Sequence, residues 1–130
     1  MIVIDASAAL AILLEEPEES SYLRVIKMAG SVILSPANYL EIAICLESRR
    51  GLEIAKRLDA WLEHLSIEIA PITASQARLA REAYARFGKG RHPATLNICD
   101  CFAYALAKES DAALLFKGDD FAKTDIAPAL

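Results

Sequence analysis

Hydrophobic residues in this chain fall into short continuous runs, separated by longer stretches in which they recur every three or four residues. The short runs predict buried strands, because each is too brief for a helix and several are rich in β-branched residues. The predicted strands span residues 1–4, 32–34, 67–69 and 113–116. The longer stretches predict helices, whose boundaries are set by proline, glycine and capping residues. The predicted helices span residues 8–14, 17–30, 36–46 (closed by 49–51), 52–65, 73–87 and 97–108.

This order of strands and helices indicates one α/β domain. Strands that alternate with helices are typical of a mainly parallel sheet, and no repeat, linker or low-complexity segment interrupts residues 1–130. Residues 88–93 form the one clear loop, and Thr73 with Gln76 predicts a capping box. Ligands bind at the carboxyl ends of the strands in such sheets, so the residues after each strand are the first candidates for a site.

The composition excludes several classes of protein. At 130 residues, 55% of them hydrophobic and 25% charged, the chain matches a folded domain rather than a disordered or fibrous protein. No apolar run approaches the ~20 residues that span a bilayer, so we expect no membrane segment. The apolar N-terminal stretch contains Asp5 and lacks a basic start, unlike a secretory signal. Three cysteines in apolar helical patterns indicate a reducing compartment, and hence a cytoplasmic protein.

Charged residues are unevenly distributed, which changes the meaning of the net charge of −4. That value alone argues against a nucleic-acid partner. However, basic residues gather in residues 49–57 and 78–92, whereas the first 20 residues contain five acids and no base. Solvent exposure explains the basic residues on the helices equally well, but the basic, glycine-containing loop suits an RNA backbone. The candidate RNA contacts are Arg86, Lys89, Arg91 and His92.

Two acidic residues stand where a charge is unfavourable. Asp5 directly follows the first strand, and Glu41 lies in the helix after Pro36 with mostly apolar residues three and four positions away. A charged carboxylate beside a core-facing stripe is costly unless it is paired or bound to a metal. Each also has a plain structural interpretation. Asp5 fits the N-cap of the next helix, and Glu41 fits an edge position from which it reaches solvent.

Three further acids have the same two interpretations. Asp100 lies between two cysteines and before an almost wholly apolar turn, although the helix dipole also favours an aspartate in a first turn. Asp119 and Asp120 follow the fourth strand, where a Gly-Asp turn is common. Together, acids that follow strands and acids on apolar helix faces can converge at one edge of the sheet.

A cluster of carboxylates favours a hard divalent cation. Carboxylates at close quarters repel one another, and their pKa values rise unless a cation joins them. Mg²⁺ or Mn²⁺ fits better than zinc, because no histidine or cysteine pair has the spacing of zinc ligands. Such a site suits hydrolysis of a phosphodiester, in which the cation polarises the phosphate and activates water. The chain contains no nucleophile elbow and no phosphate-binding glycine motif.

These residues resemble the PIN-domain ribonucleases and, within them, the VapC toxins of bacterial toxin–antitoxin modules. The opening MIVIDASA resembles the first motif of the family, and Glu41 in PANYLE resembles its second acidic position. Residues 88–105 are similar to a characteristic stretch of one VapC subgroup, and residues 115–126 resemble the closing motif. The resemblance covers essentially the whole chain.

The resemblance implies a Rossmann-like α/β/α sandwich, with residues 1–130 as a single PIN domain. It also implies a Mg²⁺-dependent endoribonuclease that cleaves cellular RNA, forms homodimers and is neutralised by a VapB-type antitoxin. The implied metal-binding and catalytic residues are Asp5, Glu41, Asp100 and Asp119, with Asp120 as the competitor for the fourth position. Ser7 and Asn97 would orient carboxylates, water or substrate.

Two other functions match parts of the sequence. A receiver-type signalling domain also combines acids at strand ends with Mg²⁺, but it needs an aspartate after a mid-chain strand, where this chain has Ala70 and Pro71. A non-catalytic interaction module would account for the excess of apolar residues. RNA cleavage that stops when the cation is chelated would separate a ribonuclease from both alternatives.

Overall fold

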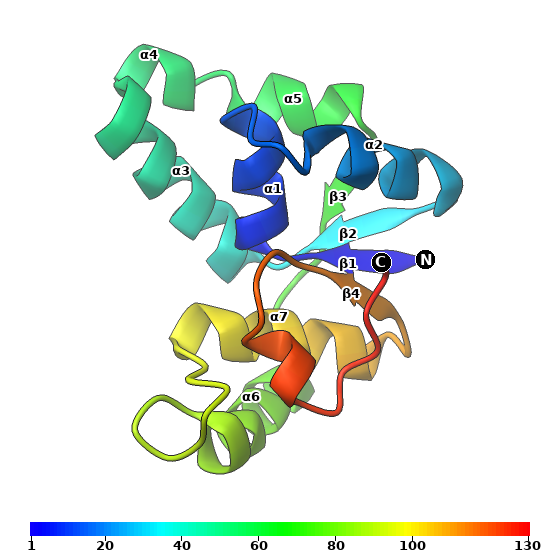
Figure 1. Ribbon diagram of the computed structural model, residues 1–130, viewed down its shortest axis with the longest axis vertical. Helices are drawn as coiled ribbons and strands as arrows, with labels where there is room; N and C mark the ends of the chain where they lie inside the picture. Colours follow the sequence, from blue (N-terminus) through cyan, green and yellow to red (C-terminus); the bar gives the residue numbers. More distant parts are fainter.

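Four parallel strands form the centre of the protein in a computed structural model that describes all 130 residues (Figure 1). The strands are β1 (Ile2–Ile4), β2 (Val32–Leu34), β3 (Ile67–Ile69) and β4 (Ala113–Leu115). Their order across the sheet is β3-β2-β1-β4, and each neighbouring pair is parallel. The four carboxyl ends therefore meet at one edge of the sheet, and β1 has a partner strand on each side.

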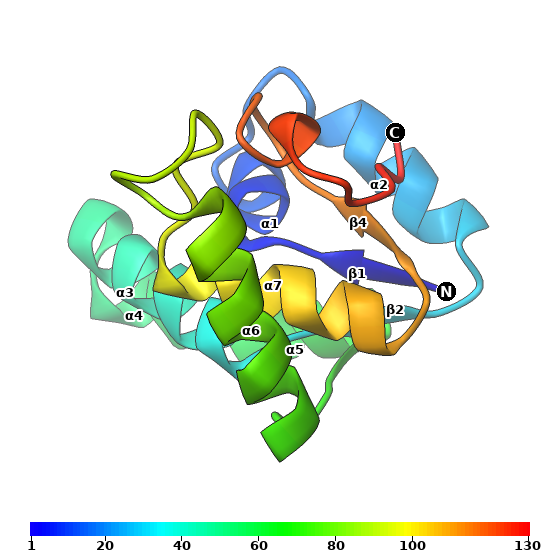
Figure 2. The same ribbon diagram turned by 90° about the horizontal axis from the view of Figure 1, so that it is seen from below.

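Helices cover both faces of this sheet, which confirms the predicted α/β/α sandwich (Figures 1 and 2). On one face lie α1 (Ala6–Leu13), α2 (Glu19–Met28), α3 (Pro36–Arg50), α4 (Leu52–Ala55) and α5 (Leu58–His64). On the other face lie α6 (Ala74–Phe87) and α7 (Ile98–Glu109). A short 3-10 helix, η1 (Phe121–Lys123), follows β4. None of the helices combines the length and the apolarity needed to cross a lipid bilayer.

The alternation of side chains along β1 divides the interior into two hydrophobic cores. Ile2 and Ile4 belong to the core beneath α1, α2, α3 and α5, whereas Val3 belongs to the core beneath α6 and α7. All three residues of β1 are buried. A strand covered on both faces has no polar side, which is why β1 reads as an unbroken apolar run in the sequence.

Residues near the C-terminus cover the outer edge of β4. The Leu114 amide donates a hydrogen bond to the Ala127 carbonyl at 2.9 Å, and the Ala129 amide donates to the Leu114 carbonyl at 2.9 Å. An uncovered strand edge would offer unpaired backbone groups to other chains. The tail that follows η1 therefore completes the sheet on this side.

The stretch predicted as one helix over residues 52–65 forms two, α4 and α5. Leu52 and Ile54 are exposed, whereas Leu58 and Leu62 are buried in the first core. α4 packs on α3, and α5 packs beside β3. One straight helix would not make both contacts, so tertiary packing overrides the continuous helical periodicity of the sequence.

The predicted capping box at the start of α6 forms only in part. Thr73 caps the helix, because its hydroxyl oxygen accepts a hydrogen bond from the Gln76 amide at 3.0 Å. The Gln76 side chain does not return this bond. It donates instead to Glu109 at 2.6 Å and to the Pro71 carbonyl at 3.1 Å, since the neighbouring α7 offers a charged acceptor.

Candidate active site

Asp5 follows β1 directly, at the edge of the sheet where the strands end. Its side chain is buried, and Oδ2 accepts hydrogen bonds from the Ser7 amide at 2.9 Å and the Ser7 hydroxyl at 2.6 Å. The Ser7 hydroxyl oxygen also accepts a hydrogen bond from the Lys117 amide at 3.0 Å, which joins the loop after β4 to the start of α1. Asp5 is therefore the N-cap of α1, and Ser7 donates both hydrogen bonds that Oδ2 of its carboxylate accepts.

Asp100 is held at the start of α7 by a capping box with Asn97. The Asp100 amide donates to Asn97 Oδ1 at 2.9 Å, and the Asn97 amide donates to Asp100 Oδ2 at 2.9 Å. The backbone amide of Asn97 therefore holds one oxygen of the Asp100 carboxylate. The first-turn interpretation of Asp100 is also correct, because the box satisfies backbone amides that the helix leaves unpaired.

Glu41 reaches the same region from α3. Ser35 caps this helix and Pro36 occupies its first position, which places Asn38 in the first turn and Glu41 one turn later. Asn38 is fully buried, and its Nδ2 donates to Asp5 Oδ1 at 3.4 Å. Glu41 is half-buried, and its Oε2 is shielded from solvent without any hydrogen-bond partner. One oxygen of Glu41 therefore faces the interior of the site rather than water.

The charges of these acids act on one another. Burial, followed by the charges of Asp5, Glu41 and Asp120, raises the pKa of Asp100 from 3.8 to about 7 against the opposing hydrogen bond from Asn97. Four carboxylates from the ends of β1 and β4 and from α3 and α7 thus share one neighbourhood. A pKa near neutrality means that Asp100 exchanges its proton in the range where most enzymes work.

Asp5, Glu41 and Asp100 are the three inner acids of the site, and burial raises the pKa of the first two as well. For Asp5, burial outweighs the hydrogen bonds from Ser7. For Glu41, burial raises the pKa first and the charge of Asp5 adds to it, while the Asn38 amide opposes the increase. The thiol of Cys99 reports the same negative field, because burial and then Glu41, Asp100 and Asp5 raise its pKa to about 11.

No basic side chain neutralises this cluster. The amide of Lys117 contacts Ser7, but its ammonium group pairs with Glu16 at 2.6 Å and with Glu18 at 3.2 Å. None of the five ion pairs in the structure includes Asp5, Glu41 or Asp100. No ion pair within the protein therefore balances the charge of these three acids.

Asp119 and Asp120, the two candidates for the fourth acid, differ in their effect on Asp100. Both side chains are exposed in the turn between β4 and η1. Only Asp120 contributes to the negative field at Asp100. Asp120 directly precedes η1, whose buried Phe121 anchors this end of the turn in the second core, whereas Asp119 lies one residue farther from that anchor.

The acids do not form a preassembled ligand set. No three Asp, Glu, His or Cys side chains are arranged so that they could hold one metal ion together. Repulsion between carboxylates favours such separation when no cation is present. Mg²⁺ nevertheless suits the residues, because it usually takes one or two carboxylates and completes its shell with waters and substrate phosphates. The unpaired, buried Oε2 of Glu41 is an oxygen of the kind that such an ion would require.

The four basic candidates divide into two kinds. Lys89 and Arg91 are exposed on the loop between α6 and α7 and form no ion pair, although Arg91 lies over the Tyr84 ring at 5.3 Å. Arg86 is paired with Asp125 at 3.7 Å. The His92 ring accepts a hydrogen bond from the Ala94 amide through Nδ1 at 3.1 Å, which shapes the loop itself. Lys89 and Arg91 are thus the two that remain available to a ligand.

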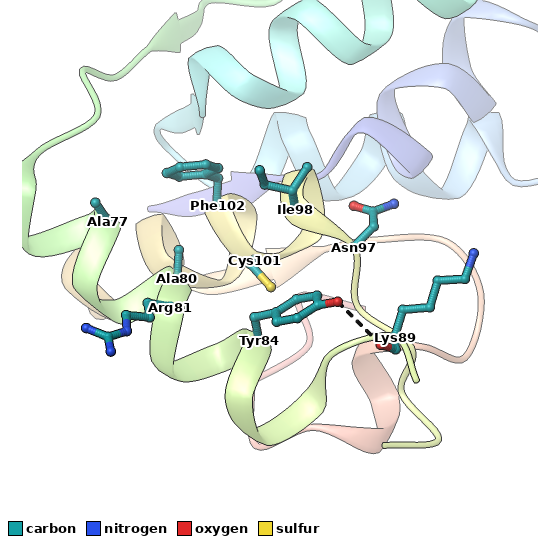
Figure 3. A pocket seen from close by; sticks show the side chains of 9 residues that line it. All are labelled: Ala77, Ala80, Arg81, Tyr84, Lys89, Asn97, Ile98, Cys101 and Phe102. Atoms are coloured by element: carbon teal, nitrogen blue, oxygen red, sulfur yellow. Dashed lines mark hydrogen bonds between the residues drawn. The ribbon is translucent and has the colours of Figure 1, made fainter. Parts of the chain in front are cut away.

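An apolar groove of about 560 Å³ lies between α6 and α7, next to the residues that hold Asp100 (Figure 3). Asn97 and Cys101 on either side of Asp100 contribute to its wall, and the aromatic side chains come from both helices. Arg81 and Lys89 are its charged residues, and no acid lines it. The groove thus extends from Lys89 on the basic loop to Asn97 at the start of α7.

Sequence patterns do not select Asn38, which the structure places at the centre of the site. It touches Asp5 and also the backbone of α7, where its Nδ2 donates to the Cys99 carbonyl at 3.3 Å. The available signal was a polar residue three positions before Glu41, on the same helix face. That signal is weak by itself, because polar residues are common in the first turn of a helix.

Comparisons with known proteins assign this architecture to a family. The family model described as the PIN domain matches residues 2–127. "Ribonuclease VapC" of Mycolicibacterium smegmatis is 48% identical over 126 residues, which cover 97% of this chain and 98% of that protein. The chain belongs to the VapC family of PIN-domain proteins. "Ribonuclease VapC30" of Mycobacterium tuberculosis is another relative, at 44% identity over 97% of this chain and 96% of that protein.

A solved structure agrees with the fold of this VapC-family chain. The crystal structure of Mycobacterium tuberculosis VapC20, described as a sarcin-ricin loop cleaving toxin, matches it with a TM-score of 0.78. The match covers 98% of this chain and 97% of the other at 17% sequence identity. At that identity the likeness establishes the shared fold.

The raised pKa of Asp100 predicts a pH-dependent gain in stability for Asp100→Asn in the metal-free protein. Between about pH 4 and pH 7 the folded state keeps a proton that the unfolded chain has lost, so the free energy of unfolding falls as the pH rises through this window. Asn keeps the capping acceptor and removes the charge. We expect it to raise the free energy of unfolding by about 1–2 kcal/mol at pH 8, a value reduced for partial exposure.

Urea unfolding with EDTA at pH 4.5 and pH 8 measures this effect. Glu63→Gln is the control, because Glu63 is an exposed acid outside the site. An equal gain in the free energy of unfolding for Asp100→Asn at both pH values would show that the charge of Asp100 does not destabilise the folded state.

Proposed function

We propose that this protein is a Mg²⁺-dependent endoribonuclease, the toxin of a toxin–antitoxin module. The observation that carries the proposal is the convergence of Asp5, Glu41 and Asp100, each with a raised pKa and none with a basic partner. Relatives that share 44–48% of their residues with this chain are named ribonucleases. Mn²⁺ offers the same preference for oxygen ligands and is the alternative cation.

The inner acids would hold the cation, and their neighbours would hold the acids. Asp5 and Asp100 each use one oxygen in a cap, which restricts the direction of the other oxygen. Glu41 would supply its unpaired Oε2, and Asp120 would stand at the exposed side of the site. A bound divalent cation would supply positive charge to the scissile phosphate and lower the pKa of water. Binding would also displace the proton of Asp100, because metal ligands act in their deprotonated forms.

Lys89 and Arg91 would contact the RNA backbone. Both are exposed on the loop that precedes α7, and neither is engaged in an ion pair. Cationic side chains near the acidic edge would offset its repulsion of a polyanionic substrate. Arg86 and His92 would support this loop, through Asp125 and the Ala94 amide respectively.

The proposal includes a VapB-type antitoxin, a cytoplasmic location and a homodimer. All three cysteines are free, as a reducing compartment requires.

Large apolar side chains are exposed on helices that pack together, notably Leu40 and Ile44 on α3 and Ile98 on α7, the last 71% exposed. Exposed apolar residues of this size are typical of protein interfaces. Light scattering should therefore give twice the chain mass of 14.1 kDa, and a single-chain mass for the purified toxin would contradict the homodimer.

Removing one inner carboxylate should abolish RNA cleavage without unfolding the protein. Asp5→Asn and Asp100→Asn keep the caps but lose a charge, and we expect kcat/KM to fall at least ~100-fold, about 3 kcal/mol in transition-state stabilisation. The measurement is cleavage of total cellular RNA with Mg²⁺, compared with EDTA. Growth arrest on expression without antitoxin should be lost in parallel.

Glu47→Gln is the matched control for this test, because Glu47 lies on α3 with Glu41 but is exposed. Wild-type cleavage that continued in EDTA would exclude the metal-dependent mechanism. Full activity of either Asp variant would exclude the assigned site.

Removing Lys89 and Arg91 should weaken RNA binding rather than the chemical step. For each phosphate that the protein no longer neutralises, the slope of log Kd against log salt should fall by about 0.7 for single-stranded RNA. A filter-binding titration at several salt concentrations with the Asp5→Asn background, which does not cleave, measures this slope. Lys27→Ala removes an exposed charge on α2 and serves as the control; an equal effect there would place RNA binding elsewhere.

A further inference from the structure

Asn38 contacts the acidic site from the interior of the protein. It is fully buried on α3, with 0% of its surface exposed. Its Nδ2 donates to Asp5 Oδ1 at 3.4 Å and to the Cys99 carbonyl at 3.3 Å. Both distances are longer than the usual range of about 2.7–3.2 Å, since one amide group spans acceptors on two elements.

The contact with Cys99 is a direct link between α3 and α7. The capping box orients Asp100 within its own helix, but it does not set the distance from α7 to Glu41. Asn38 and its neighbour supply that link, because the Cys99 thiol also approaches the Ala37 carbonyl at 3.9 Å. Two successive residues of α3 therefore hold the turn that carries Asp100.

Packing alone does not account for an asparagine at this position. Its carbonyl oxygen, Oδ1, is buried and has no hydrogen-bond donor. Leaving a buried acceptor unpaired costs roughly 1–3 kcal/mol, which an apolar residue would avoid. The two hydrogen bonds that Nδ2 donates, to Asp5 and to the Cys99 carbonyl, offset this cost.

We propose that Asn38 is a positioning residue, which holds Asp5 and the first turn of α7 at the spacing from Glu41 that a divalent cation requires. This inference rests on the metal-dependent function proposed above. In this role Asn38 would act on the cation and RNA only indirectly. Its effect passes through the carboxylates, as it does for the hydrogen-bond partners of metal ligands in other proteins, whose loss typically costs 10–100-fold in metal affinity or activity.

The chain contains a matched control for this proposal. Gln76 is 2% exposed, and its amide also donates to one carboxylate, Glu109 at 2.6 Å, and to one carbonyl, Pro71 at 3.1 Å. Its Oε1 likewise has no donor. Gln76 therefore repeats the environment of Asn38 at the far end of α6, away from the acids. A variant there reports the cost of losing a buried amide without touching the site.

The experiment compares Asn38→Ala and Gln76→Ala. Mn²⁺ binding is followed by electron paramagnetic resonance without RNA, cleavage gives kcat and KM, and thermal unfolding in EDTA gives stability. Both variants should unfold at lower temperature than the wild type. Only Asn38→Ala should lose Mn²⁺ affinity, by about 10–100-fold, with a lower kcat at saturating metal and an unchanged KM for RNA.

A second variant guards against failure to fold. Asn38→Thr has a similar volume but one hydroxyl donor, so it fills the space without making both hydrogen bonds, and it should show the same loss of Mn²⁺ affinity. Wild-type affinity in either Asn38 variant, or an equal loss in Gln76→Ala, would overturn the positioning role. A wild-type protein that neither binds Mn²⁺ nor cleaves RNA would instead overturn the proposed function, and the two failures are thus distinct.

Discussion

Burial of the Asp5 carboxylate at the end of the central strand is the constraint on which the site depends. An ionised carboxylate loses its hydration there, and three donated hydrogen bonds, two from Ser7 and one from Asn38, replace only part of it. Its pKa accordingly rises. The groups around Asp5 either donate to it or, like Glu41 and Asp100, are affected by its charge. The fold thus concentrates negative charge where it provides no cation.

Helix capping and site assembly use the same side chains in this protein. Asp5 caps α1, and Asp100 closes the capping box of α7. Each cap stabilises a helix by about 1 kcal/mol, and it also holds one oxygen of a carboxylate in a defined direction. The two interpretations that the sequence left open for these acids are therefore compatible. The capping role and the proposed metal-binding role use different oxygens of the same carboxylate.

The fold and the inner acids could be predicted because each follows a local rule. A buried strand followed by an aspartate is visible in the sequence, and so is a glutamate with apolar neighbours on a helix. The difference between Asp120 and Asp119 depends on how the turn after β4 meets Asp100, which only the packed structure defines. The role of Asn38 depends on the approach of α3 to α7, between residues separated by 61 positions. The division of helix 52–65 likewise follows from tertiary contacts that no local pattern encodes.

The two cores on opposite faces of the sheet have a consequence for how this protein can diverge. α6, α7 and the basic loop rest on one core, whereas α1, α2, α3 and α5 rest on the other. Substitutions at sites without shared contacts have nearly additive effects on stability. The layer with the basic loop can therefore accumulate changes over evolutionary time without new adjustments in the other layer. The layers meet where α3 packs against α7 and Asn38 contacts the Cys99 carbonyl, and changes there would require adjustments in both layers.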